Sequence, residues 1–251
     1  MDLKLAGKRA VVTGGSKGIG RAIAVGLAAE GVSVAICARS EQPLREAEAE
    51  IRSHGVEAYA EPCDVGDGDA LDGFLDRARE RLGGVDILVN NVSALGRGDD
   101  LSAWQANIDL DLLASVRATQ RVTPWMSEAG GGSIIFISSI SGIEPSATAS
   151  YSAIKAALIS YSKFLAISLA PQRIRVNTIA PGSIEFEGGV WDRARQHTPE
   201  RYQATLARIP WGRMGRPEEV ADVAVFLASE RAGWITGACV PVDGAQHKAI
   251  L

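Results

Sequence analysis

Seven short runs of apolar residues recur along the chain, and most of them are continuous rather than alternating. A continuous apolar run rich in Val and Ile is typical of a strand that helices cover on both faces of a sheet. The runs with this pattern are residues 9–15, 32–39, 56–65, 85–91, 132–139, 174–182 and 238–244. We therefore expect these segments to be the strands of a largely parallel sheet.

Longer segments between these runs have the spacing of amphipathic helices, with apolar residues three to four positions apart. They are residues 18–30, 41–54, 67–82, 102–128, 149–170 and 217–229. Regular alternation of strands and helices predicts an α/β protein with a doubly wound parallel sheet. No linker or repeat divides the chain, so we expect one domain over residues 1–251. The one long irregular stretch, about 183–212, has a length typical of a substrate loop or lid.

Composition narrows the classes of function. The formal net charge is -4 and the sequence pI is about 5.5, which disfavours a nucleic-acid partner. The three cysteines are odd in number and the three histidines are far apart, so neither a disulfide framework nor a metal site is expected. The first strand pattern begins within ten residues of the start, and no apolar run has the length of a membrane span. We expect a cytoplasmic protein without a membrane partner.

A glycine-rich turn, "TGGSKGIG" at residues 13–20, lies between the first strand and the first helix. Glycines at such a turn let the backbone approach a pyrophosphate, and the helix N-terminus supplies unpaired N–H groups. The position after the first strand of an alternating chain makes a dinucleotide site the favoured interpretation. The spacing T-G-x-x-x-G-x-G differs from the G-x-G-x-x-G of ordinary dinucleotide domains.

With this turn, the chain resembles the short-chain dehydrogenase/reductase family, and in particular its 3-oxoacyl-reductase-like members. The resemblance covers nearly the whole chain, because the family's motifs occur in the family's order. They are "TGGSKGIG", "CDV", "LVNN", "ISSISG", a Y-x-x-x-K pair, "VNTIAPG", "GRMGRPEEVADVAVFLAS" and "ITGACVPVDG". The resemblance implies a single Rossmann-type domain that interconverts a ketone and a secondary alcohol by hydride transfer with a nicotinamide cofactor.

Tyr151 and Lys155 stand one helical turn apart in the nearly uncharged run "ASYSAIKAAL". By resemblance, Tyr151 is the general acid/base, and Lys155 works beside it and binds the nicotinamide ribose. A lysine ammonium one turn away favours the phenolate form of a tyrosine. The alternative is an amphipathic pair in which Tyr151 packs and Lys155 reaches solvent.

Two further catalytic positions follow from the resemblance, each with an alternative. The S-x-x-G pattern selects Ser139 as the serine that holds the substrate oxygen, with Ser138 as the fallback. The family's asparagine, seven residues after a tryptophan, corresponds to Asp111; Asn107 lies one turn earlier and is a substitute that the spacing disfavours. Asp111 either joins the proton path through Lys155, or it points into solvent or pairs with another cation.

The resemblance also implies a set of cofactor-binding residues. They are Gly14, Ser16, Lys17, Gly18, Ile19, Gly20, Arg39, Asp64, Val65, Asn91, Tyr151, Lys155, Pro181, Gly182 and Ile184. Relatives that prefer NAD place an acidic residue after the second strand, where this chain has Ala38 followed by Arg39. Two cations near an uncharged pocket floor suit a 2′-phosphate, so we expect NADP(H) to be preferred, with NAD(H) also accepted.

Several departures and surface features bear on the substrate and on assembly. "NNVS" (residues 90–93) replaces the family's "NNAG", and Phe186 stands where the family commonly has a threonine. These departures motivate the rival hypothesis of a nucleotide-binding regulatory module with little turnover; an extended-branch epimerase is disfavoured by the glycine spacing. Residues 124–133 lack Lys and Arg, which disfavours an acyl-carrier-protein substrate, whereas Phe186, Trp191 and Trp211 could line a pocket for a free, partly apolar small-molecule ketone. The apolar helix 149–170 predicts a homo-oligomer, by resemblance a tetramer.

Overall fold

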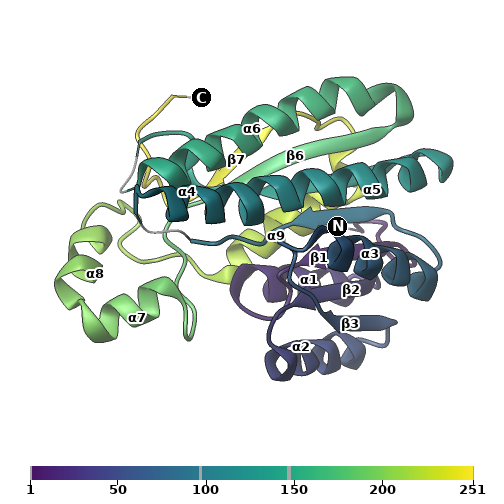
Figure 1. The fold of residues 1–251 in the computed structure, drawn as a ribbon, viewed down its shortest axis with the longest axis horizontal. Helices are drawn as coiled ribbons and strands as arrows, with labels where there is room; N and C mark the ends of the chain where they lie inside the picture. Colours follow the sequence, from purple (N-terminus) through teal and green to yellow (C-terminus); the bar gives the residue numbers. More distant parts are fainter. Residues whose placement is uncertain (1, 96–97, 146–147, 251) are drawn as a thin grey trace.

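The computed structural model describes residues 2–95, 98–145 and 148–250 and contains a seven-stranded sheet (Figure 1). Its strands are β1 (Arg9–Thr13), β2 (Ser33–Ala38), β3 (Ala58–Pro62), β4 (Ile87–Asn90), β5 (Gly132–Ile137), β6 (Ile174–Pro181) and β7 (Cys239–Val242). They lie in the order β3-β2-β1-β4-β5-β6-β7, and every neighbouring pair is parallel. The predicted doubly wound α/β sheet is confirmed.

Helices cover both faces of this sheet. One core contains side chains of α1 (Gly18–Ala29), α2 (Glu41–Ser53) and α9 (Pro217–Ala228), and the other contains those of α3 (Gly68–Leu82), α5 (Ala114–Glu128) and α6 (Ala149–Leu169). Val11 and Val12 on β1 are both fully buried, yet they belong to opposite cores. This alternation explains why the strand segments are apolar throughout, since neither face meets water.

The expected single helix over residues 102–128 is wrong in its middle. The structure has α4 (Leu101–Asn107), a π-helical segment (Ile108–Leu113) and then α5. The Ser115 hydroxyl donates a hydrogen bond to the Asp111 carbonyl over 2.8 Å within this distortion. A π-helical turn inserts one extra residue per turn and is frequent at functional sites. Here it contains Asp111.

The stretch 183–212 is also less irregular than expected. It contains α7 (Val190–His197) and α8 (Pro199–Leu206), which form an outlying pair beside the sheet (Figure 1). Pro199 at the first position of α8 is a helix-start signal that the segment's length obscured. Glu185 ties the two helices together, because it pairs with Arg195 at 3.0 Å and accepts a hydrogen bond from the Tyr202 hydroxyl over 2.8 Å. We call residues 183–212 the lid.

Helix α6 with its extension to Gln172 is long and apolar enough to cross a membrane by length and composition alone. The core helix of a protein without membrane spans passes the same test. In this structure Leu158, Leu165 and Leu169 of α6 pack in the core against the sheet, and the same helix contains the buried Lys155. Packing on the sheet therefore explains the apolar residues on one face of this helix.

Candidate active site

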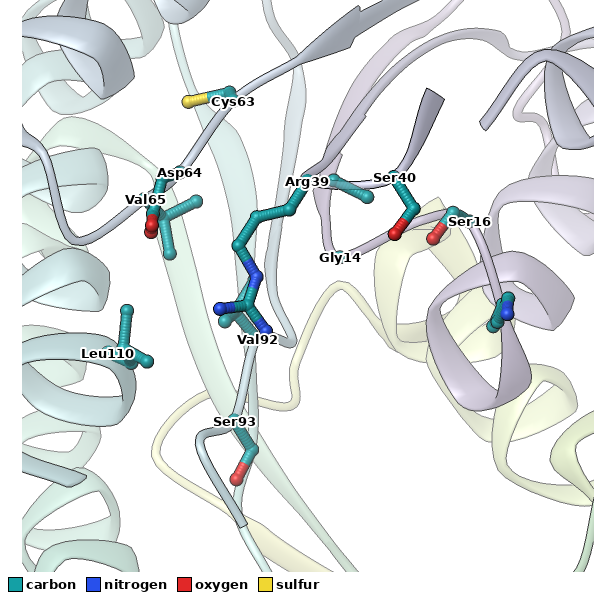
Figure 2. Close-up of a pocket in the computed structure, with 12 residues that line it drawn as sticks. Gly14, Ser16, Arg39, Ser40, Cys63, Asp64, Val65, Val92, Ser93 and Leu110 are labelled. Carbon is teal, nitrogen blue, oxygen red and sulfur yellow. The ribbon is translucent and has the colours of Figure 1, made fainter. Parts of the chain in front are cut away.

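The carboxyl ends of β1 to β4 meet along one edge of the sheet and form a pocket there (Figure 2). Ligands of open α/β sheets bind at this edge, where the strand order reverses between β1 and β4. The pocket is lined by Gly14, Ser16, Lys17, Ala38, Arg39, Ser40, Cys63, Asp64, Val65, Val92, Ser93 and Leu110. Six of the residues predicted to bind a cofactor are among them: Gly14, Ser16, Lys17, Arg39, Asp64 and Val65.

The glycine turn needs glycine for two separate physical reasons. Gly14 has a φ of 69°, a left-handed conformation that other residues rarely adopt. A Cβ atom on Gly20 would lie 2.3 Å from the Gly14 carbonyl oxygen, so only glycine fits the first turn of α1. Asn91 fixes the turn from β4, since its Nδ2 donates to the carbonyls of Thr13 and Gly14 over 3.1 and 3.2 Å. The fit is that of a cradle for a dinucleotide pyrophosphate.

The floor of the pocket beyond β2 is basic and hydroxylated. Figure 2 shows the Arg39 side chain extending across the pocket, and the hydroxyl-bearing side chains of Ser16 and Ser40 line the same pocket. Asp64 also lines the pocket, and its carboxylate accepts a hydrogen bond from the Gly66 N–H over 3.0 Å. At the position that would hold an acidic residue after β2, the structure has Ala38.

Tyr151 and Lys155 are positioned by the start of α6. Asp99, from a segment fifty residues away, caps the helix: its Oδ1 accepts hydrogen bonds from the N–H groups of Ala149 and Ser150 over 3.0 and 3.3 Å. The Lys155 ammonium lies 5.5 Å from the centre of the Tyr151 ring. Lys155 is 1% exposed, so it does not reach solvent as the amphipathic alternative required.

The Lys155 ammonium is held by two oxygen atoms. It lies 2.9 Å from Oδ1 of Asp111 and donates a hydrogen bond to the Ile137 carbonyl at the end of β5 over 3.1 Å. Burial alone would lower the pKa of Lys155, and this is the largest single effect. The charge and hydrogen bond of Asp111, together with Tyr151, outweigh it and raise the pKa above its ordinary value. The lysine is therefore kept as a cation in a dry environment.

Asp111 is fully buried in the π-helical segment and does not point into solvent. Its Oδ2 accepts a hydrogen bond from the Ala94 N–H over 2.8 Å, and Oδ1 accepts none in the described part of the chain, which leaves it to the ammonium. Asn107, the other candidate, donates instead to the Ser150 hydroxyl over 3.1 Å. The structure thus brings Asp111, and not Asn107, to Lys155.

The two serines at the end of β5 have different partners. The Ser138 hydroxyl donates to the Lys155 carbonyl over 2.8 Å, so it anchors the strand end to α6. The Ser139 hydroxyl accepts a hydrogen bond from the Ser141 N–H over 3.1 Å and keeps its own proton for another partner. A Cβ on Gly142 would lie 2.6 Å from the Lys155 carbonyl carbon, so the glycine of S-x-x-G lets this loop pack on α6.

The other residues expected to bind the cofactor follow β6 or lie on α1, and each contacts a different part of the protein. Gly182, after Pro181 at the end of β6, donates its N–H to the Val242 carbonyl over 3.0 Å, and Ile184 is 7% exposed beside Gly215. Ile19 packs against the core on α1.

The three aromatic residues of the lid do not share one neighbour. The Phe186 ring packs on the glycine turn, since a Cβ on Gly18 would lie 2.5 Å from it. The Trp191 ring lies 5.3 Å below the Arg201 guanidinium, and Trp211 is 71% exposed beside Gly244. Phe186, which stands where the family commonly has a threonine, therefore contacts the glycine turn.

The sequence did not reveal the residues from distant segments that position α6 and the glycine turn. Asp99 gives no local signal as a cap, because the helix that it caps begins fifty positions later. Thr13 accepts a hydrogen bond from the Asn91 N–H over 3.1 Å and so helps to join β1 to β4. Contacts between distant segments of this kind become visible only in the folded chain.

Comparison with known proteins agrees with the sheet and the pocket. Residues 14–247 match the family profile described as enoyl-(acyl carrier protein) reductase. The human dehydrogenase/reductase SDR family member 4 is 38% identical over 249 residues, covering 96% of this chain and 87% of that protein. A 3-oxoacyl-[acyl-carrier-protein] reductase of Thermotoga maritima is 36% identical, covering 96% and 98%.

Two solved structures are similar over almost their whole length. A 7α-hydroxysteroid dehydrogenase complexed with NADH and 7-oxoglycochenodeoxycholic acid has a TM-score of 0.90 at 33% identity, covering 97% of this chain and 96% of that one. The L-sorbose reductase of Gluconobacter frateurii, complexed with NADPH and L-sorbose, has a TM-score of 0.91 at 34% identity and covers 100% of both. This chain belongs to the short-chain dehydrogenase/reductase family, enzymes that act on CH–OH and C=O groups with a nicotinamide cofactor.

Proposed function

We propose that this enzyme interconverts a ketone and a secondary alcohol with NADP(H), with Tyr151 as the general acid/base. The observation that carries the proposal is the buried Asp111–Lys155 pair one helical turn from Tyr151, at the edge of the sheet that also forms the cofactor pocket. The nicotinamide cofactor supplies or accepts the hydride. Tyr151 gives the carbonyl oxygen its proton in reduction and removes the alcohol proton in oxidation.

The neighbours of Tyr151 have separate tasks in this proposal. The Ser139 hydroxyl, whose proton is not used by the Ser141 contact, donates to the substrate oxygen and orients it. The Lys155 ammonium lies beside the Tyr151 ring, where its charge assists proton transfer at Tyr151, and it holds the ribose of the cofactor. Asp111 keeps Lys155 charged and directed at this site, while the Asp111 charge partly offsets the effect of Lys155 on Tyr151.

The preference for NADP(H) is supported by the basic floor of the pocket. Arg39 has no acidic partner within hydrogen-bonding distance in the described part of the chain, and Lys17 lines the same pocket. An arginine can bind a 2′-phosphate through two N–H groups, whereas NADH offers a hydroxyl there. Similar enzymes have been solved with NADH and with NADPH, so this floor is the feature that distinguishes the two cofactors.

Arg39→Ala should lower kcat/KM for NADPH about tenfold to a hundredfold, the loss expected for a charge-assisted hydrogen bond, and leave kcat/KM for NADH nearly unchanged. Arg45→Ala is the matched control, because Arg45 lies on α2 and pairs there with Glu48 at 3.2 Å. Steady-state kinetics with both cofactors measure the effect. A wild-type preference for NADH that Arg39→Ala leaves unaltered would contradict the assignment.

A free ketone is the proposed substrate class, rather than an acyl group on a carrier protein. Glu128, at the end of α5, lies in the segment 124–133 that has no basic residue, which gives an acidic carrier little to bind. A relative named as a carrier-protein reductase makes this test necessary. Turnover of free ketones, followed by the absorbance of NADPH, is expected; turnover of carrier-bound acyl chains alone would refute it.

A second candidate is a nucleotide-binding regulatory module with little turnover. It is favoured by the Phe186 ring, which packs on Gly18 of the glycine turn, and by Val92 and Ser93, side chains that line the pocket where relatives have smaller residues. The complete set of Ser139, Tyr151 and Lys155 argues against it. NADPH binding without turnover of any carbonyl compound would favour the module.

We further propose a cytoplasmic homo-oligomer, a dimer or a tetramer. The three cysteines are free thiols, as in a reducing compartment. On the outer face of α6, Phe164 is 67% and Ile167 is 71% exposed, which is unusual for side chains of this size on a helix that faces water. Light scattering should show an oligomer that Phe164→Glu with Ile167→Glu dissociates. A wild-type monomer at micromolar concentration would exclude burial of this face between subunits.

A further inference from the structure

Residues 243–248, near the end of the described chain, are tied by hydrogen bonds to two separate loops. We call Asp243–Lys248 the C-terminal strap. At one end the Gln246 side chain forms two hydrogen bonds with Ser183. Its Oε1 accepts from the Ser183 N–H over 2.8 Å, and its Nε2 donates to the Ser183 hydroxyl over 3.0 Å. At the other end the Lys248 N–H donates to the Glu144 carboxylate over 2.7 Å.

These two anchors belong to the two loops that flank the proposed reaction site. Ser183 follows Gly182 at the end of β6, and a Cβ on Gly182 would lie 2.7 Å from both Cβ of Asp243 and Oε1 of Gln246. Glu144 follows the short turn that begins after Ser139. Figure 1 shows the strap leaving β7 and rising past the lid toward the end of the chain. A segment fixed to both loops closes the space between them.

The strap begins with a tight turn that is strained. The Gln246 N–H donates to the Asp243 carbonyl over 3.1 Å across Gly244 and Ala245, whose φ angles are 60° and 63°. Alanine in the left-handed region costs about 1–2 kcal/mol, and such strain persists where the surrounding contacts impose it, often at functional sites. The residues that follow this turn are held on both sides, because Gln246 bonds Ser183 and His247 bonds Asp243.

His247 is oriented by Asp243 through two contacts to one carboxylate oxygen. Its backbone N–H donates to Oδ2 over 2.8 Å, and its ring Nδ1 lies 2.6 Å from the same atom. The side chain of Asp243 is 7% and that of His247 is 14% exposed. With its proton on Nδ1 facing the carboxylate, the neutral ring keeps a lone pair on Nε2, which accepts a hydrogen bond. No described contact uses Nε2.

We propose that the C-terminal strap forms one wall of the substrate site and that His247 selects neutral ketones bearing a further hydroxyl group, which donates to Nε2. This inference rests on the proposed ketone reduction. The charges around the ring favour a neutral substrate, because Asp243 and Glu144 are acidic and the Lys248 ammonium turns back to the Ala245 carbonyl at the surface, over 2.9 Å. A carboxylate on the substrate would meet two like charges.

Matched pairs of ketones test the selection, each pair differing in one hydroxyl group set at increasing distance from the carbonyl. For the wild-type holoenzyme, at least one hydroxylated member should have the higher kcat/KM. His247→Ala should lower that value about tenfold more than it lowers the value of the deoxy member, because one hydrogen bond is lost only for the hydroxylated ketone. His54→Ala, an exposed histidine at the end of α2, is the control and should change neither.

A second pair of variants tests the wall itself. Glu144→Ala should speed hydrogen exchange of the Lys248 amide and reduce the same selectivity, whereas Glu144→Gln keeps an acceptor and should restore both. Wild-type turnover without discrimination within any pair, or equal loss for both members in His247→Ala, would overturn the inference and leave the proposed function standing. Absence of turnover for every ketone would instead sink the proposed function, and the inference with it.

Discussion

Replacing Asp111 by Ala is expected to lower the free energy of unfolding by about 3–5 kcal/mol at neutral pH, because it leaves a buried cation without its partner. The Lys155 and Asp111 side chains are 2% and 0% exposed, so water cannot take the place of the lost carboxylate. Asp109→Ala is the matched control, since Asp109 lies in the same π-helical segment and bonds Gln105 at the surface. Urea unfolding of both variants measures the difference.

The pH dependence of this loss has a definite sign. In the wild type the pKa of Lys155 is raised above its unfolded value of about 10.4, so its contribution to stability is complete below that pH and is lost as pH rises through the higher folded pKa. Without Asp111, only Tyr151 still opposes the effect of burial, which is the largest single effect, so we expect the folded pKa of Lys155 to fall below the unfolded one. Asp111→Ala should therefore gain stability as pH rises toward 10.4, where the wild type does not.

Asp111→Asn separates the charge of this residue from its shape. Asparagine keeps an oxygen for the ammonium, so we expect the variant to retain activity. Loss of the negative charge removes the main effect that raises the pKa of Lys155, so that pKa should fall and the basic limb of the pH–rate profile for oxidation should move to lower pH. An unmoved profile, with wild-type stability in Asp111→Ala, would show that the pair is not formed in solution.

Tyr151→Phe should lower kcat by about two to four orders of magnitude, the usual contribution of a positioned general acid or base. The substitution removes only the phenol oxygen, and the glycine turn, Arg39 and Asp64 stay in place to bind the cofactor. NADPH binding, followed by fluorescence titration, should therefore change far less than turnover. A fall in affinity equal to the fall in kcat would point to a binding role instead.

Tyr161→Phe is the matched control for this experiment. Tyr161 lies on the same helix, ten residues later, and its ring packs edge-on against Phe136 at 5.8 Å between ring centres. Removal of its hydroxyl leaves that ring contact intact and should leave kcat near the wild-type value. Comparable losses in the two variants would mean that α6 tolerates no loss of a phenol hydroxyl, and would withdraw support from Tyr151 as the acid/base.

The fold was predictable because its strands carry their own signal. Each strand is buried on both faces, so neighbouring residues such as Val11 and Val12 are both apolar. This continuous apolar pattern can be recognised in the sequence without knowing which strands lie next to each other. The glycine turn was predictable for a similar reason. Gly14 needs a positive φ angle and Gly20 has no room for a Cβ atom, and both constraints arise within the turn itself. The Y-x-x-x-K pair shares one turn of one helix, so spacing alone places it.

The remaining features depend on distant segments. The π-helical turn at Asp111 has no signature in a pattern of apolar residues, and the ion pair with Lys155 forms between two helices separated by β5 in the chain. The S-x-x-G pattern predicts Ser139, but the hydrogen bond from the Ser138 hydroxyl to the Lys155 carbonyl, which gives the two serines different partners, is not visible in any count of positions. The lid was expected to be irregular because its two short helices are joined by Glu185, which lies outside both of them. Its contacts with Arg195 and Tyr202 are not visible in the sequence.

The central claim is that this chain transfers a hydride between NADP(H) and a ketone. The most direct measurement uses NADPH dideuterated at the nicotinamide C4, incubated with the wild-type enzyme and a panel of ketones, and mass spectrometry of the products. We expect an alcohol that carries one deuterium on the former carbonyl carbon, formed by the wild type and about two to four orders of magnitude more slowly by Tyr151→Phe. Tight binding of NADPH with no deuterated alcohol from any ketone would contradict it.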